Sequence, residues 1–414
     1  MKEELYSIDQ ALELSKGDVA KLYKNHVNPG LATMLSLLNF DRQFVKAKGT
    51  KVWDIDGNEY LDFLGGYGSL NLGHNPTAVV EAVKRVMELP NILQASMSTM
   101  EAVAAHNLSK LTPGDLSHTF FCNSGTEAVE GAIKTARIAS GKYHVLYCRN
   151  SFHGKTMGSL SVTGRTKYQQ PFAPLVPGNE MVDYGDIKGL EDKLKSGQFA
   201  AFIIEPIQGE GGINMPPENY FRGVRDICDK YGVYFILDEI QTGFGRTGKM
   251  FAADHDNICP DFICLAKSLG GGLMPIGAFT TTANIWNKAY GGIDKALLHT
   301  STFGGNTLAT TAAIATMNEL VEKDIPAQAA EKGEYLMNGL NTLAEKYEMI
   351  KEVRGRGLLI GLEFKELESG ILDKISGGML SKLSKEYLGA MVAGALVNDH
   401  KIITAYTLNN PNVI

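Results

Sequence analysis

The sequence predicts an α/β fold built on a mostly parallel sheet. Between residues 76 and 310, short apolar runs alternate with stretches of helical periodicity. Strands that alternate with helices are typical of parallel sheets whose two faces are covered by the crossover helices. A second observation is that 45 of the 414 residues are Gly and that they cluster, which marks sharp turns or a close approach of backbone to ligand. The expected strands lie at 118–122, 144–148, 201–204, 233–237, 262–265 and 276–280, and the expected helices at 127–140, 216–231 and 308–322.

The segments on either side of this region predict a smaller α+β domain made from both ends of the chain. We expect residues 1–75 and 311–414 to pack together beside a large domain formed by residues 76–310. The chain stops at TLNNPNVI, where a strand-like segment begins, so we expect the C-terminal part of the small domain to be incomplete. The elements expected in the small domain are an amphipathic helix over 8–24, a hairpin over 51–64 with its turn at Asp56–Gly57, a strand over 354–364 and a helix over 377–399.

Composition argues against several classes of protein. The 40 basic and 46 acidic residues give a net charge of -6 without a basic stripe, so nucleic acid is not an expected partner. The five Cys form an odd count without a C-x-x-C pair, so we expect reduced thiols, no disulfide framework and no metal site. No apolar run approaches the ~18 residues that span a bilayer, and the first residues carry no secretory pattern. We therefore expect a cytoplasmic protein without membrane partners.

Four of the apolar runs are followed by distinctive polar residues. Segment 123–126 follows the first run, Glu205 the third, Asp238 the fourth, and Lys267 comes one Ala after the fifth. In parallel α/β sheets, ligands bind outside the carboxyl ends of the strands. Polar residues also end strands simply because loops are polar, but four of them together favour one shared site.

The first of these segments, NSGTEAVEGAIKTAR, predicts a strand end, a Gly turn and a helix. A helix N-terminus offers free amides that suit a phosphate; Gly125 permits close approach, and Ser124 or Thr126 adds a hydroxyl. The same segment also fits a plain capping box, because Ser124 and Glu127 have the S-x-x-E spacing. The segment alone favours neither interpretation.

Lys267 lies in AKSLGGGLMPIGA, among apolar and Gly neighbours. Burial there would lower its pKa and make the amine a nucleophile, whereas a solvated Lys at a strand end is the ordinary alternative. A nucleophilic Lys, a carboxylate such as Asp238 and a phosphate cradle at neighbouring strand ends are what pyridoxal phosphate (PLP) requires. An aromatic residue stacked on the cofactor ring would complete the set. Phe152 is the candidate, although a core Phe at a loop start is an equal alternative.

Six segments of the chain resemble the class III (ω-amino acid) aminotransferases, a family of fold-type-I PLP enzymes. They occur in the family's order and cover most of the chain. Within the family, the motifs VNPG (27–30), FLGGYG (63–68) and PLVPG (174–178) and the terminal TLNN are most similar to putrescine aminotransferases. The six segments are NSGTEAVEGAIKTAR (123–137), FHGKTMGSLS (152–161), EPIQGEGG (205–212), LDEIQTGFGRTGKMFA (237–252), AKSLGGGLMPIGA (266–278) and TSTFGGNTLA (300–309).

The resemblance implies a role for each matching residue. Glu210 can pair with a carboxylate-binding Arg and so help to separate substrates of different charge, and that Arg would follow Ile414. Ser124 is a further cofactor-binding candidate. By position, Lys267 forms the Schiff base with PLP, Asp238 pairs with the pyridinium nitrogen, Gln241 reaches the ring hydroxyl, Gly125 and Thr126 hold the phosphate, Phe152 stacks on the ring beside His153, Glu205 supports the site, and Thr302 reaches the phosphate of the neighbouring subunit.

The resemblance therefore implies transamination of a terminal amine. The finer match favours putrescine as donor, giving 4-aminobutanal, with 2-oxoglutarate as acceptor. Ornithine, acetylornithine and 4-aminobutyrate aminotransferases share the main motifs and remain alternatives. The same fold also supports an aminomutase, a racemase, a decarboxylase or a truncated inactive relative, so these stay open as well. The role of Thr302 implies a homodimer, or a dimer of dimers, with shared active sites.

Overall fold

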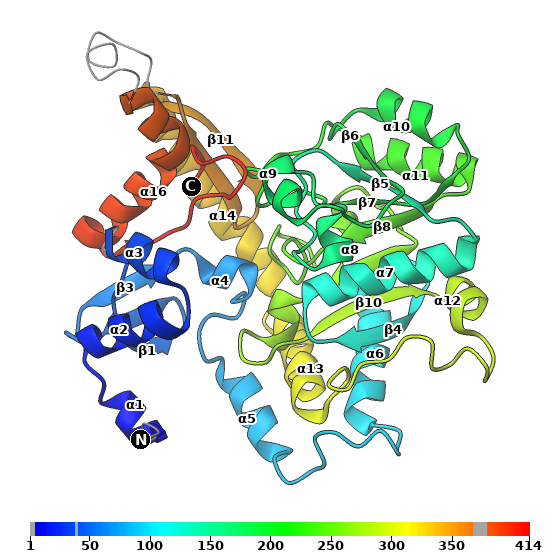
Figure 1. Cartoon of the computed structure of the whole chain (residues 1–414), viewed down its shortest axis with the longest axis horizontal. Helices are drawn as coiled ribbons and strands as arrows, with labels where there is room; N and C mark the ends of the chain where they lie inside the picture. Colours follow the sequence, from blue (N-terminus) through cyan, green and yellow to red (C-terminus); the bar gives the residue numbers. More distant parts are fainter. Residues whose placement is uncertain (1–4, 38–39, 367–378) are drawn as a thin grey trace.

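In the computed structural model, which describes residues 5–37, 40–366 and 379–414, the apolar runs form part of one seven-stranded sheet (Figure 1). The strand order is β4–β10–β9–β8–β7–β5–β6. Neighbouring strands are parallel, except that β10 runs antiparallel to both β4 and β9. The predicted α/β fold with a mostly parallel sheet is confirmed. The strands are β4 (Leu116–Cys122), β5 (His144–Cys148), β6 (Asn179–Val182), β7 (Phe199–Ile204), β8 (Tyr234–Asp238), β9 (Phe262–Leu265) and β10 (Gly277–Thr282).

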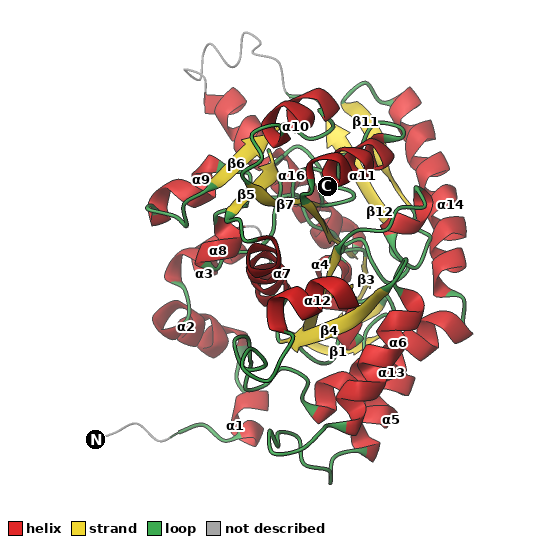
Figure 2. Cartoon of the chain, turned by 90° about the vertical axis from the view of Figure 1, so that its right-hand side faces the viewer, coloured by secondary structure: helices red, strands yellow, loops and turns green. Residues whose placement is uncertain are grey.

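Helices cover both faces of this sheet (Figure 2). Two of them, α7 and α12, bury apolar residues against one face, and α6, α10, α11 and α13 do so against the other. Every residue of β7 is buried, which explains its continuous apolar run. The helices around the sheet are α5 (Thr77–Arg85), α6 (Thr99–Leu111), α7 (Gly125–Ser140), α8 (Met157–Leu160), α9 (Thr166–Gln169), α10 (Ile187–Leu194), α11 (Tyr220–Tyr231), α12 (Ala283–Tyr290) and α13 (Thr307–Glu322), with 3₁₀ helices at η1 (Gln170–Phe172), η2 (Ala252–His255) and η3 (Lys267–Gly270).

The two ends of the chain share a second, four-stranded sheet with the order β1–β2–β3–β13. Its last strand runs parallel to β3 and comes from the C-terminal part of the chain. The predicted hairpin over 51–64 is present as β2 and β3. We propose that residues 1–75 and 311–414 form the small domain and residues 76–310 the large one; α13 straddles the second boundary and packs its apolar side against the large sheet. The strands are β1 (Phe44–Lys48), β2 (Lys51–Asp54), β3 (Glu59–Asp62) and β13 (Ile402–Ile403).

Two predicted elements of the small domain are wrong in detail. The single helix expected over 8–24 is two helices, because Ser7 and Ser15 each cap a helix N-terminus. The single strand expected over 354–364 is a hairpin, because Gly357 adopts φ +57 and reverses the chain. The remaining elements are α1 (Ile8–Leu12), α2 (Lys16–His26), α3 (Pro29–Leu37), α4 (Gly65–Gly68), α14 (Ile325–Lys346), β11 (Ile350–Arg356), β12 (Leu359–Phe364) and α16 (Met379–His400).

The long helix expected over 377–399 corresponds to α16, and its first two residues lie outside the described parts of the chain. In the large domain, α11 begins at Tyr220 rather than at residue 216, because Pro216 and Pro217 precede it and Asn219 takes a left-handed conformation at its cap. No helix within the described residues is both long enough and apolar enough to cross a lipid bilayer.

Candidate active site

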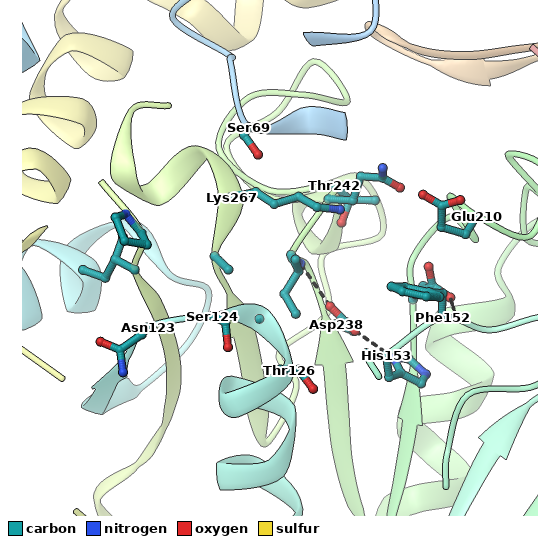
Figure 3. Close-up of a pocket in the computed structure, with 18 of the residues that line it drawn as sticks. Ser69, Asn123, Ser124, Thr126, Phe152, His153, Glu210, Asp238, Thr242 and Lys267 are labelled. Atoms are coloured by element: carbon teal, nitrogen blue, oxygen red, sulfur yellow. Dashed lines mark hydrogen bonds and ion pairs between the residues drawn. The ribbon is translucent and has the colours of Figure 1, made fainter. Parts of the chain in front are cut away.

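The polar residues that follow the strands meet at one edge of the large sheet, where they line a cavity of about 560 Å³ (Figure 3). Thr302 is the exception: it is exposed, lies outside this cavity, and its carbonyl accepts a hydrogen bond from the Gln94 side chain at 3.0 Å. The site residues predicted from sequence that line the cavity are Ser124, Gly125, Thr126, Phe152, His153, Glu205, Glu210, Asp238, Gln241 and Lys267.

The N-terminus of α7 opens into the cavity. Ser124 is the N-cap, and its hydroxyl accepts a hydrogen bond from the Glu127 amide at 3.4 Å while donating to the Glu127 carboxylate at 2.8 Å. Ser124 therefore caps the helix, but the reciprocal bond of a capping box is displaced by one residue, because the Glu127 carboxylate accepts from the Asn123 amide at 2.9 Å. The cap does not exclude a ligand, because Gly125 and Thr126, the first two residues of α7, still line the cavity. A 16-residue helix presents a positive dipole end and free amides there, which suit an anion.

The loop after β5 and the start of α8 pack against Thr126 beside the cavity. The Thr126 hydroxyl lies 2.7 Å from that of Thr156 and 2.6 Å from that of Ser159. Gly154 packs against them with φ +131, and a Cβ there would lie 2.4 Å from Thr126 Oγ1. Only Gly fits this position. Gly154 lines the cavity but was not among the site residues predicted from sequence, although a Gly followed by hydroxyl residues in FHGKTMGS carried the signal; Thr156 and Ser159 support Thr126 from outside the lining.

Asp238 ends β8, and each of its two carboxylate oxygens has a hydrogen-bond partner. His153 Nδ1 lies 2.7 Å from Asp238 Oδ2, and the Ile240 amide donates to Asp238 Oδ1 at 3.1 Å. Both side chains of the His–Asp pair are buried. The other ring nitrogen, His153 Nε2, is buried without a hydrogen-bond partner among the described residues. The pair therefore fixes a carboxylate at the floor of the cavity.

Glu205, just after β7, ties two cavity loops together. Its carboxylate accepts hydrogen bonds from the Phe152 amide at 2.9 Å and the Gly209 amide at 3.3 Å. Burial, and next the negative charge of Asp238, raise the pKa of Glu205 well above its usual range. Gly209 also packs tightly against Gln241, because a Cβ at position 209 would lie 1.5 Å from Gln241 Oε1. Gln241 in turn donates from Nε2 to the Tyr67 carbonyl at 3.2 Å.

Lys267 begins η3, and its chain reaches across the cavity toward Glu210 (Figure 3). Its backbone has φ +47, a strained conformation for a residue with a side chain and one that is common at functional sites. Desolvation by the surrounding protein lowers the pKa of Lys267, while Glu210 and Asp238 oppose that shift. The expectation of a lysine with a lowered pKa fits this environment. Its amine is thereby a better nucleophile and base near neutral pH.

The chemistry of this cavity fits PLP. An amine of lowered pKa can bind the aldehyde, the end of α7 can bind the phosphate, and a buried carboxylate can face the ring nitrogen. Such a site at the carboxyl ends of a mostly parallel sheet places the protein among the fold-type-I PLP enzymes. The chain belongs to the class-III aminotransferases, since the model of that family matches residues 37–391. It is an aminotransferase, and its cofactor is PLP.

Solved aminotransferase structures are similar to the chain over most of its length. One is the ornithine aminotransferase of Toxoplasma gondii, with partial occupancy of PLP at its active site: it is 32% identical, with a TM-score of 0.86, over 99% of this chain and 92% of that chain. The acetylornithine aminotransferase of Elizabethkingia anophelis is 27% identical, with a TM-score of 0.76, over 96% of this chain and 92% of that one. A taurine:2-oxoglutarate aminotransferase of Bifidobacterium kashiwanohense, in complex with PLP and glutamate, is 28% identical, with a TM-score of 0.78, over 86% of this chain and 84% of that one.

Proposed function

We propose that the enzyme transaminates the terminal amine of a diamine, with putrescine as the best candidate, and passes the amino group to 2-oxoglutarate. The observation that carries the proposal is the position of Glu210. Its carboxylate lies in the same cavity as Lys267. Among the neighbouring charges, that of Glu210 has the largest effect in raising the pKa of Lys267 against desolvation. A diamine offers one amine to the reaction and a second, cationic end that such a carboxylate attracts. The product from putrescine is 4-aminobutanal.

Two residues carry the proposed chemistry. PLP, when bound, supplies an electron sink that stabilises negative charge at the substrate carbon. Lys267 Nζ would hold the cofactor through its aldehyde, and as a neutral amine Lys267 is also the base that would take the proton of the amine-bearing carbon. Asp238 keeps a proton on the pyridine nitrogen, and His153 holds the Asp238 carboxylate in place through the 2.7 Å contact.

The other cavity residues bind and orient in this proposal. Gly125 and Thr126 donate to the phosphate, with the Ser124 cap beside them. Phe152 stacks on the ring, and Glu205 holds its backbone through the amide contact at 2.9 Å. Gln241 reaches the ring hydroxyl.

We further propose that the enzyme is a homodimer, or a dimer of dimers, whose active sites are shared. Thr302, which does not reach the cavity of its own chain, would bind the phosphate in the partner. Apolar side chains near Thr302 in sequence support a covered surface, since Ile293 is 97% exposed, Leu297 82% and Phe303 53%. Large exposed apolar side chains gathered along one segment are typical of protein interfaces.

A panel of amines tests the proposal. The full chain, loaded with PLP, is assayed with putrescine, cadaverine, ornithine and 4-aminobutyrate against 2-oxoglutarate, and glutamate formation is measured. We expect the highest kcat/KM with putrescine. Glu210→Gln, which keeps the size of the side chain but removes its charge, should lower kcat/KM for putrescine about tenfold and leave 4-aminobutyrate nearly unchanged. A wild-type preference for 4-aminobutyrate would overturn the diamine assignment.

Ornithine is the second candidate, because a cation also lines the cavity. The ammonium of Lys155 lies 5.9 Å from the ring centre of Phe152 and 5.3 Å from that of Tyr168. It could pair with the carboxylate of an amino acid while Glu210 binds the adjacent ammonium. The likeness to ornithine and acetylornithine aminotransferases supports this alternative. In the panel, a higher kcat/KM for ornithine than for putrescine would favour it.

A further inference from the structure

The C-terminal segment 407–410 holds the carboxylate that the proposed function assigns to the distal end of the substrate. The Leu408 amide donates to Glu210 Oε2 at 3.1 Å, and the Asn409 amide donates to the Glu210 carbonyl at 2.9 Å. Glu210 is thus fixed at both its side chain and its backbone by residues about two hundred positions later in the chain. Glu210 lines the cavity, and its second oxygen, Oε1, accepts no hydrogen bond within the described residues.

Arg165 in turn anchors this segment. Its guanidinium donates to the Leu408 carbonyl and, at 2.9 Å, to Asn409 Oδ1. Both acceptors are neutral and both bonds come from Arg165 Nη1, so the guanidinium holds a piece of chain rather than forming an ion pair. The guanidinium also lies over the ring of Tyr168, 5.2 Å from its centre, which fixes its plane.

Other hydrogen bonds also hold this segment and the residues after it, without involving Arg165 or Glu210. The Asn409 side chain donates to the Asn150 carbonyl at 2.9 Å. Further along, the Ile414 amide donates to the Leu362 carbonyl at 3.1 Å, which ties the following residues to β12. Loss of the Arg165 contacts would therefore loosen residues 407–410 without releasing the chain beyond them. Arg165 is not among the described residues that line the cavity.

We propose that Arg165 is a specificity-determining positioning residue: through Leu408 and Asn409 it fixes the Glu210 carboxylate for the distal ammonium of a diamine. The proposal rests on the proposed function, because it gives Glu210 the role of binding that ammonium. Its consequence is selective. A substrate with a cationic far end needs an oriented Glu210, whereas a monoamine of the same length needs only the cofactor and Lys267.

The test compares putrescine with pentylamine, which has a methyl group where putrescine has its second ammonium. The ratio of kcat/KM for the two amines is measured in the PLP-loaded wild type, in Arg165→Gln and in Arg149→Gln. Arg149 is the matched control, since it is an exposed Arg whose guanidinium pairs with Asp183 at 2.6 Å. We expect Arg165→Gln to reduce the preference for putrescine about tenfold, mainly through KM, with pentylamine unchanged, and Arg149→Gln to keep the preference. Amide hydrogen exchange of residues 407–410 should be faster in Arg165→Gln.

The possible contrary results distinguish a failure of the proposed diamine function from a failure of the role of Arg165 alone. If the wild type does not prefer putrescine to pentylamine, the proposed diamine function fails, and the role of Arg165 fails with it. If the wild type prefers putrescine and Arg165→Gln keeps the full preference, or loses activity equally with both amines, only the role of Arg165 fails. If Arg165→Gln does not fold, as judged by its melting temperature, Arg165→Lys is tested instead, because it keeps the positive charge but replaces the planar guanidinium with an ammonium. That variant should lose part of the preference, and full retention would overturn the proposal.

Discussion

Gly154→Ala is the most direct perturbation of the proposed phosphate cradle. Gly154 has φ +131, and the added Cβ would lie 2.4 Å from Thr126 Oγ1 and 2.5 Å from Ser159 Oγ. A strained backbone of this kind costs about 1 to 3 kcal/mol. To relieve the contact, the hydroxyl of Thr126, a cavity residue at the N-terminus of α7, must move. The strain lowers the melting temperature with or without PLP, whereas the displaced hydroxyl acts on binding: a lost hydrogen bond to a charged group costs about 1.5 to 3 kcal/mol, so we expect PLP to bind about 10- to 100-fold more weakly to the variant.

The assay is a titration of cofactor-free protein with PLP, followed by absorbance, together with the melting temperature of the cofactor-free form. Gly178→Ala is the matched control. Gly178 also has positive φ, +84, and its Cβ would lie 2.7 Å from Tyr143, but it is not a cavity residue among those described. Both variants should melt at a lower temperature than the wild type, and only Gly154→Ala should raise the Kd for PLP. Equal Kd values for the two variants would refute the assignment of this cradle to the phosphate.

Two further predictions concern a buried acid and the partner subunit. Burial raises the pKa of Glu239 from 4.5 to about 7, so the native state holds this proton more tightly than the unfolded state does. The protonated carboxyl therefore contributes roughly 3 kcal/mol to the free energy of unfolding below pH 4.5, and this contribution is lost as the pH rises through 7. Relative to Glu239→Gln, the wild-type free energy of unfolding should therefore fall by that amount between about pH 5 and pH 8, and a difference that is constant with pH would contradict this. If Thr302 binds the phosphate in the partner subunit, as proposed, Thr302→Ala should weaken PLP binding about tenfold although Thr302 lies outside its own cavity, because the change would remove a hydrogen bond to a charged group. An unchanged Kd in a protein that elutes as a dimer would exclude the shared site.

Local sequence patterns predicted the large sheet and most of the cavity because the relevant signals lie within a few residues of one another. Asp238 ends one buried strand and Lys267 comes just after another, and the carboxyl ends of parallel strands meet at one edge. The Ser124 cap and the helix after it were readable from a single segment. Sequence reasoning could not separate a capping role from a ligand-binding role there, because one helix end performs both.

What the sequence did not reveal depends on contacts between distant segments or on strand direction. The antiparallel β10 is buried as its neighbour β9 is, so burial along the strand does not reveal its direction. The contact between Glu210 and Leu408 joins residues 198 positions apart, and neither residue signals the other. The reversal at Gly357 was hidden because RGRGLLIGLEF reads as one continuous strand, although each half pairs with the other.

Identification of the lysine that carries the cofactor tests the central claim most directly. Reduction of the PLP-loaded protein with borohydride makes the link to PLP permanent, and peptide mass mapping then locates it. We expect the label on the peptide that contains Lys267, and no labelled peptide from a folded Lys267→Ala variant. A label on another lysine, or none in folded protein that binds PLP, would contradict the account.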